Sequence, residues 1–279
     1  MPFIKKNNID FWIKNNQIVL DPNYLETNRQ VFKKITGSRF ASILGKSEYA
    51  TPVKTWAIMT GLYREPMDQT LAKVGNVIEP MVRQYVENKT NQKYICYDPA
   101  KVNWDVFAEN KIFGGIPDGE PIDENGKLLY PEKPMLEIKT TSIDAFVYKR
   151  QNGVLTMQKD ESGIPLIKEE KKKYNSWFRN NKIFIPTEYM YQLGLYMYLR
   201  DVQSAIFAIA FLKKEDYAFP ENFDVNNHEI KIVKMNVSLK EFNKEIEFAT
   251  NWYEKHITTG FSPILSEEDK KWLIEQGIL

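Results

Sequence analysis

Cysteine and histidine are almost absent from this chain of 279 residues, which has one cysteine, Cys96, and two histidines, His228 and His256. A single cysteine excludes an internal disulfide framework and any all-cysteine metal or iron–sulfur site. Two histidines that lie outside every motif are too few for a zinc site or a histidine-based triad. We therefore expect Cys96 to be a small buried residue in a strand and both histidines to be structural or exposed.

Long apolar runs and a strong charge of either sign are missing too. No stretch of 18 or more uninterrupted apolar residues is present, which argues against a transmembrane helix. Residues 1–6 lack the long apolar run of a secretory signal, so we expect a cytoplasmic protein without a membrane partner. The net charge of +1 neither indicates nor excludes nucleic acid, because a protein can confine its positive charge to one groove.

Apolar residues make up 43% of the chain, an ordinary globular composition that suits one large domain or one domain with appendages. Helical spacing and capping signals predict helices at residues 51–60, 74–88 and 188–200. The first of these begins at Thr51-Pro52, an N-cap followed by proline at the first helical position.

The middle of the chain is rich in short strand patterns. Strands are expected at residues 94–97, 104–108, 112–116 and 135–139, with residues 123–127 as the hairpin turn between the last two. An unbroken apolar run predicts a buried strand at 205–212, and alternation predicts another at 229–237. Ser238 and Glu241 form a capping box for a last helix, whose apolar face carries Phe242, Ile246, Ala249 and Trp252.

This order of elements predicts an α/β fold, a mixed central β-sheet flanked by helices, in a single domain spanning residues 1–279. Residues 1–35 are interpreted as a lead-in and 36–212 as the core, which carries a mobile, charged insertion at about 150–182. Residues 213–279 are interpreted as a C-terminal strand and helix extension.

Three polar residues in the strand-rich region suggest a catalytic site. Asp118 follows one predicted strand, and Glu137 and Lys139 lie on the next, separated by Ile138. Because strand side chains alternate, Glu137 and Lys139 share a face while Ile138 points into the core. The two carboxylates and the carbonyl of Ile138 are oxygen ligands that suit Mg²⁺. Lys139 can then orient a water that attacks a phosphodiester, or stabilise its hydroxide form.

Taken alone, Glu-x-Lys is common on exposed strand faces. The surrounding sequence decides whether this pair is a chance occurrence or part of a catalytic site. Lys139 stands among apolar strand residues, where a charged pair needs partners or a purpose. Glu79, on the helix before the sheet, is a candidate third carboxylate at the metal. Gln192, on the helix after it, is a candidate to hold Lys139 or the water by a hydrogen bond.

The order of these residues resembles the PD-(D/E)XK nuclease superfamily, and specifically the phage lambda exonuclease and YqaJ-type viral recombinase group. Four blocks carry the resemblance: residues 36–52, residues 75–87, Asp118 with Glu137–Lys139, and residues 185–192. The resemblance implies a restriction-endonuclease-like core and a metal-dependent DNA nuclease in which Asp118, Glu137, Lys139, Glu79 and Gln192 act as described above. It also implies that Ser38 and Arg39 contact a DNA phosphate.

A second candidate DNA contact lies between residues 168 and 182, where six basic residues and two acids give a net charge of +4. The residues expected to contact DNA there are Lys171, Lys172, Lys173, Trp177 and Arg179. The alternative is a solvated loop, and the sequence leaves both open. The tyrosines and methionines of 189–198 can stack on bases, but more often such a run packs a helix against a sheet.

The leading function is an exonuclease or end-processing nuclease of phage or mobile-element recombination or repair. It would use Mg²⁺, with Mn²⁺ as a substitute, on double-stranded DNA with free ends. The alternatives are a restriction-type endonuclease and a non-catalytic DNA-binding protein on the same fold. ATP is not expected, because Gly45-Lys46-Ser47 lacks the Walker A glycine and has Phe40 in its place. A homo-oligomer and a single-strand annealing partner follow only by analogy.

Overall fold

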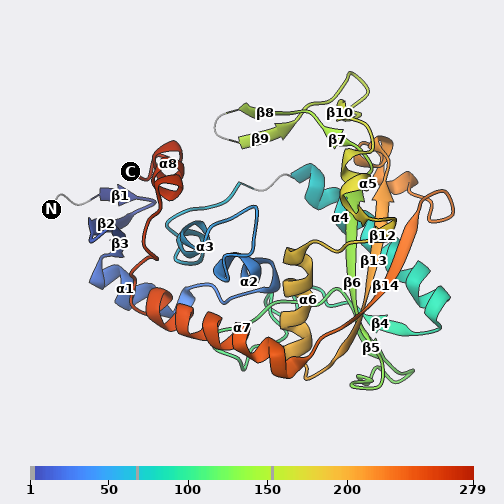
Figure 1. The fold of residues 1–279 in the computed structure, drawn as a ribbon, viewed down its shortest axis with the longest axis horizontal. Coiled ribbons are helices and arrows are strands. Elements are labelled where there is room, and N and C mark those ends of the chain that lie inside the picture. The colour runs from blue at the N-terminus through green and yellow to red at the C-terminus, as the bar shows by residue number, and fades with distance from the viewer. Residues whose placement is uncertain (1–3, 67–68, 152–153) are drawn as a thin grey trace.

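A three-stranded mixed sheet forms the centre of one half of the molecule (Figure 1). The computed structural model describes residues 4–66, 69–151 and 154–279. The sheet consists of β6 (Met135–Ser142), β13 (Ser204–Leu212) and β14 (Ile230–Asn236), in the order β14-β13-β6. β13 runs parallel to β6 and antiparallel to β14. The predicted mixed sheet is confirmed, and β14 is part of it although it lies in the predicted C-terminal extension.

Two helices cover the two faces of this sheet. Alternate residues of β13 separate between them: Ile206, Ala208 and Ala210 pack on the side of α4 (Gln69–Thr90), and Phe207 and Phe211 pack on the side of α6 (Thr187–Leu199). Because both faces are buried, the strand is apolar from Ala205 to Leu212, as the unbroken run predicted. In Figure 1, α6 stands between the sheet and the other half of the molecule.

The other half joins the two ends of the chain. An antiparallel sheet of β1 (Ile4–Lys6), β2 (Ile9–Lys14) and β3 (Gln17–Leu20) lies beside α8 (Glu267–Glu275) (Figure 1). The amide of Leu20 donates to the carbonyl of Gly260 (3.0 Å), and that of Ser262 donates to Ile18 (2.9 Å). Residues 1–35, interpreted as a lead-in, therefore contain strands that need the distant C-terminal segment to bury their apolar side chains.

Helices complete this half. The predicted helix at 51–60 is α3 (Pro52–Met59), in which Thr51 Oγ1 caps the amide of Lys54 (3.1 Å). The last predicted helix is α7 (Leu239–Trp252), whose N-cap Ser238 accepts from the amide of Glu241. Its apolar face packs in the same hydrophobic core as Phe11 and Trp56. The remaining helices of this half are α1 (Pro22–Asn28), η1 (Arg29–Val31), α2 (Gly37–Ile43) and η4 (Tyr253–Ile257).

Two predicted strands, 104–108 and 112–116, are wrong. Asp105 Oδ1 accepts the amides of Phe107 (2.9 Å) and Gly115 (3.0 Å), and Asn110 Oδ1 accepts those of Ile112 and Phe113. These side chains compete with a strand ladder for the backbone donors, so the segment folds as linked turns. The strand before the 123–127 turn is instead β5 (Glu120–Ile122), which pairs with β4 (Lys93–Ile95).

The predicted charged insertion at about 150–182 has regular structure. Together with residues 145–149 just before it, it forms three antiparallel pairs of short strands and one short helix. These elements are β7 (Ala145–Phe146), β8 (Tyr148–Gln151), β9 (Val154–Met157), β10 (Ile167–Glu169), α5 (Lys172–Ser176), β11 (Phe178–Arg179) and β12 (Lys182–Ile183). The short 3-10 helices η2 (Lys214–Tyr217) and η3 (Pro220–Asn222) follow β13 and precede β14.

The rare residue types have ordinary surroundings. His228 Nε2 lies 2.8 Å from Asp216 Oδ2, and buried His256 places Nδ1 3.0 Å from the carbonyl of Phe261, so both histidines are structural, as predicted. Cys96 is exposed one residue beyond β4, so the expectation of a buried cysteine is wrong. Within the described ranges, no helix is long and apolar enough to span a membrane.

Candidate active site

Asp118, Glu137 and Lys139 meet at the edge strand β6 on the side of α6. Lys139 Nζ lies 2.6 Å from Glu137 Oε1, so the two side chains share a face while Ile138 is buried in the opposite core. Asp118 Oδ2 accepts the amide of Ile138 at 2.8 Å, which ties the aspartate to the same strand. The structure thus brings together the three groups that the sequence singled out.

A sharp turn before Asp118 depends on Gly115. This residue has φ +130°, and a Cβ built on it would lie 2.6 Å from the hydroxyl of Tyr196. Only glycine tolerates that conformation and that approach. From there the chain continues to Gly119, which exchanges backbone hydrogen bonds with Leu136 on β6 (3.1 and 2.9 Å). The bridge between Gly119 and Leu136 sets Asp118 opposite the Glu137–Lys139 segment.

Helix α6 supplies the polar support for this cluster. Gln192 Nε2 donates to Glu137 Oε1 at 2.6 Å, and Lys139 Nζ donates to Gln192 Oε1 at 3.4 Å. Gln192 therefore contacts Lys139, as predicted, and holds Glu137 more closely. The Lys139 ammonium also lies 5.0 Å from the ring centre of Tyr189. Tyr189 was not among the predicted site residues, although it lies three residues before Gln192 and thus on the same helical face.

The carboxylates are close enough to disturb one another's ionisation. Burial raises the pKa of Glu137 to about 8, and Asp118 adds to the increase, while Lys139 opposes it. Burial and Asp118 likewise raise the pKa of Glu79, on α4, to about 7. Burial lowers the pKa of Lys139, but the Glu137 and Asp118 carboxylates outweigh it and raise the value overall. Glu79 therefore belongs to the same electrostatic cluster.

One atom of this cluster lacks a partner. Glu137 is fully buried, and both of its hydrogen bonds fall on Oε1, which leaves Oε2 without any. A buried carboxylate oxygen without a donor is costly, and a divalent cation would satisfy it. Among the described residues, however, no group of three or more His, Cys, Asp or Glu side chains lies in ligating geometry. The donor set that fits a cation here is therefore a pair of carboxylates completed by backbone and water oxygens.

The residues predicted to contact DNA have different surroundings. Ser38 is exposed on α2, whereas Arg39 is half-buried and donates to Thr36 Oγ1 (3.0 Å) and to the carbonyl of Lys34 (3.4 Å). Helix α2 lies very close to α6, because a Cβ on Gly37 would meet Gln192 Cγ at 2.6 Å. This contact sets Ser38 and Arg39 beside the helix that carries Gln192.

The basic segment around α5 is partly solvent-facing. Lys171, Lys172 and Lys173 are exposed, and exposed Arg179 stacks its guanidinium 3.5 Å from the ring centre of Phe184. Trp177 was predicted to contact DNA, but it is buried, stacks on Tyr189 and donates to Thr141 Oγ1 (3.3 Å). The interleaved aromatic residue packs the segment onto the core and does not face solvent.

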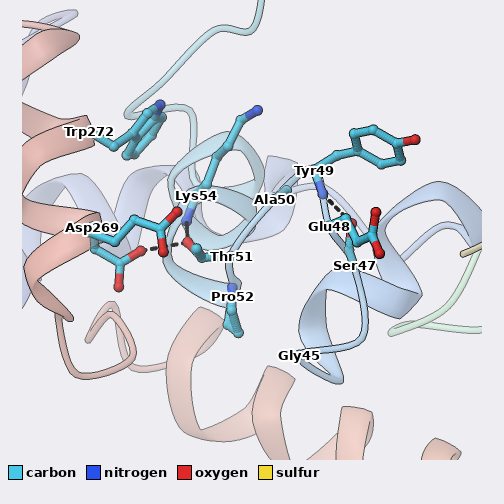
Figure 2. Close-up of a pocket in the computed structure, with 11 residues that line it drawn as sticks. Gly45, Ser47, Glu48, Tyr49, Ala50, Thr51, Pro52, Lys54, Asp269 and Trp272 are labelled. Atoms are coloured by element: carbon cyan, nitrogen blue, oxygen red, sulfur yellow. Dashed lines mark hydrogen bonds between the residues drawn. The ribbon is translucent and has the colours of Figure 1, made fainter.

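A separate hollow of about 420 Å³ lies between residues 45–54 and α8 (Figure 2). Thr51 Oγ1 donates to Asp269 Oδ1 (2.6 Å) on α8, and the amide of Glu48 donates to Glu188 (2.9 Å) on α6. Figure 2 shows the exposed Tyr49 ring pointing away from Trp272. The hollow contains none of the catalytic candidates, and its polar contacts connect the C-terminal helix to the helix that carries Gln192.

Comparisons with known proteins place the chain in a family. The model of the YqaJ-like viral recombinase domain matches residues 23–203. Two relatives are similar over the full length of both chains, the uncharacterized protein MG373 of Mycoplasma genitalium (51% identity over 280 residues) and the MG373 homolog of Mycoplasma pneumoniae (48%).

A solved structure shares the fold. The crystal structure of a phage-related exonuclease from Haemophilus somnus 129PT is similar with a TM-score of 0.51 and 13% sequence identity, over 83% of this chain and 96% of that one. The domain match covers more than half of the chain and includes all four sequence blocks that carry the resemblance. The chain belongs to the YqaJ-like viral recombinase domain family, within the PD-(D/E)XK nuclease superfamily.

Proposed function

We propose that this protein is a divalent-metal-dependent DNA exonuclease, or end-processing nuclease, of recombination or repair. The observation that carries the proposal is the state of Glu137. It is fully buried between Lys139 and Gln192, near Asp118, and keeps one oxygen without a partner. A chain that needed Glu137 only for stability would gain nothing from a second carboxylate beside it.

Asp118, Glu137 and the carbonyl of Ile138 would hold the metal, with Glu79 completing the negative charge around it. Mg²⁺, or Mn²⁺ in its place, would supply positive charge to the scissile phosphate. The oxygen donors present match the preference of both ions.

The protein's own side chains account for the remaining chemistry. Lys139, held by Glu137 and Gln192, places an ammonium group where it can orient the attacking water and stabilise negative charge on the phosphate. Tyr189 packs beside the ammonium and restricts its position.

DNA would reach this site along two surfaces. Ser38 and Arg39 lie beside α6 and suit a backbone phosphate near the site. The exposed residues Lys171, Lys172, Lys173 and Arg179 suit phosphates farther along the duplex, where contact depends on salt concentration. Double-stranded DNA with free ends is the proposed substrate.

Hydrolysis of linear and closed circular duplex, with Mg²⁺ or Mn²⁺ and with or without chelator, tests the proposal. We expect degradation of the linear form only, no activity in chelator, and a loss of about 10³-fold or more in Asp118→Ala and Lys139→Ala. Glu229→Ala and Lys231→Ala, from an exposed ion pair on and beside β14, are the matched controls and should keep full activity. Discrete fragments from circular DNA would indicate an endonuclease, and full activity in Asp118→Ala would remove the metal site.

A further inference from the structure

A second cavity, of about 790 Å³, opens beside the active site. Its walls come from the start of α2 and from the Trp104 loop, which we define as residues 98–116. Gly115, Ile116 and Tyr196 line its inner side. Ile116 precedes Asp118 by two residues, a chain distance of at most about 7.6 Å between their Cα atoms. A strand whose phosphate reaches Asp118 therefore has this cavity as its next space.

The wall of the cavity carries more positive than negative charge, with Lys33, Lys34 and Arg39 against Asp105. Lys34 is paired with Asp105 (2.6 Å), but Lys33 and Arg39 have no carboxylate within salt-bridge distance in the described part of the chain. Arg39 donates only to neutral oxygens. Burial lowers the pKa of Lys33, and the cations of Arg39 and Arg64 lower it further, while Glu65 opposes them. Lys33 and Arg39 therefore repel each other. An anionic ligand would relieve that repulsion.

Trp104 stands at the wall of this cavity with 72% of its surface exposed. Its backbone is left-handed (φ +63°), as is that of Asn103 (φ +50°), a conformation that a bulky side chain rarely adopts. The Trp104 amide donates to the carbonyl of Pro99 (2.8 Å), and the Asp105 carboxylate fixes the next turn through Phe107 and Gly115. The loop thus holds a large aromatic face in solvent at some conformational cost.

We propose that this cavity is a subsite for an unpaired nucleotide, with Trp104 stacking on its base and Lys33 and Arg39 facing its phosphates. Exposed aromatic faces combined with cations are how proteins hold single strands, because every base has a face to stack. In a blunt duplex the bases are paired, and only the outer face of the terminal pair is not stacked on a neighbouring base. An unpaired nucleotide can instead enter the cavity and place its base against Trp104. The inference rests on the proposed nuclease function and specifies its substrate as a strand end with unpaired nucleotides.

Binding without hydrolysis separates this inference from the nuclease proposal. Fluorescence anisotropy in chelator would compare a labelled oligothymidylate, a blunt duplex and a duplex with a single-stranded tail. Trp104→Gly is the main variant, because glycine favours the left-handed backbone and the loop should keep its shape. Trp104→Tyr tests rescue by another aromatic ring, and Phe248→Ala removes an exposed aromatic residue on α7 as the matched control.

We expect Trp104→Gly to weaken binding of the single strand and the tailed duplex by about 5- to 150-fold, and blunt duplex by less than about 3-fold. Trp104→Tyr should retain most of the affinity, and Phe248→Ala all of it. Unchanged single-strand binding in Trp104→Gly, or an equal loss for all three DNAs, would overturn the subsite. Selective binding without any hydrolysis by the wild-type protein would support the subsite and refute the nuclease.

Discussion

Two fully buried glutamates, one on β5 and one on β6, show how differently this protein treats similar charges. Glu120 accepts from Arg200 through Nε (2.6 Å) and Nη2 (2.8 Å) and from the hydroxyl of Tyr97 (2.7 Å), so both oxygens have donors. Glu137 has a lysine and a glutamine on one oxygen and nothing on the other.

The difference indicates that Glu120 has a structural role and that Glu137 belongs to a functional site. The Glu120–Arg200 pair is bidentate, so the buried carboxylate is fully compensated by the guanidinium. The guanidinium also lies 4.6 Å from the ring centre of Phe107. It fixes β5 to the end of α6. Glu137 instead has a neighbouring carboxylate and a raised pKa, so its surroundings favour an additional cation.

Glu137→Gln should have the largest effect on function. We expect hydrolysis to fall by about 10³-fold or more, because the amide is a poor metal ligand. The free energy of unfolding in chelator should stay the same or rise, because the amide removes a buried charge from beside Asp118. Nuclease assays and denaturant unfolding measure the two effects. A loss of stability equal to that of a core mutation would mean that Glu137, like Glu120, is architectural.

Arg200→Met should show the opposite pattern. Removing the cation leaves Glu120 buried without its main partner, which should cost about 3–5 kcal/mol of unfolding free energy. Arg200 lies about 12 Å from Gln192 along α6, so the folded fraction should keep its activity. The double variant Glu120→Gln/Arg200→Met should recover much of the lost stability, as chemical unfolding can show. Loss of activity without loss of stability would contradict the assignment.

The smallest effect concerns pH. Folding raises the pKa of Glu79 to about 7 and of Glu137 to about 8, so the folded protein binds more protons than the unfolded chain in this range. The unfolding free energy in chelator should therefore fall as pH rises from about 5 to about 8. The fall should be smaller than the sum of the two separate shifts, because the two glutamates belong to one interacting cluster. The double variant Glu79→Gln/Glu137→Gln should flatten the curve. An unchanged slope in that variant would show that other groups cause it.

Much of the fold follows from local pattern. The β13 run, the α4 spacing and the caps at Thr51 and Ser238 each report burial or backbone bonding within a few residues. The sequence did not predict the β1–β3 sheet or the turns of the Trp104 loop. The former depends on partners some 240 residues away, and the latter on side chains that take backbone donors from a strand.

The sequence indicated which side chains belong to the candidate site, but it predicted only part of the contacts between them. Alternation on β6 predicted that Glu137 and Lys139 share a face, and the helices before and after the sheet supplied Glu79 and Gln192 as candidates. The hydrogen bond from Gln192 to Glu137, the approach of Tyr189 and the burial of Trp177 arise where α6 and α5 pack on the sheet. Trp104 carried no motif, because its exposure depends on a left-handed backbone that the sequence does not display.

The meeting of the two chain ends bears on how the protein matures. Phe11 and Ile18 share one core with Leu265, Leu273 and Ile278, and Trp56 donates to the carbonyl of His256 (3.0 Å). A ribosome makes α2 and α3 before residues 257–278, so the apolar faces of these helices are covered only after that later segment has been made. Helix α2 packs against the helix that carries Gln192. The candidate active site would therefore not be complete on a nascent chain that lacks residues 257–278. The capacity to cleave DNA would therefore arise only after residues 257–278 have been synthesised and packed.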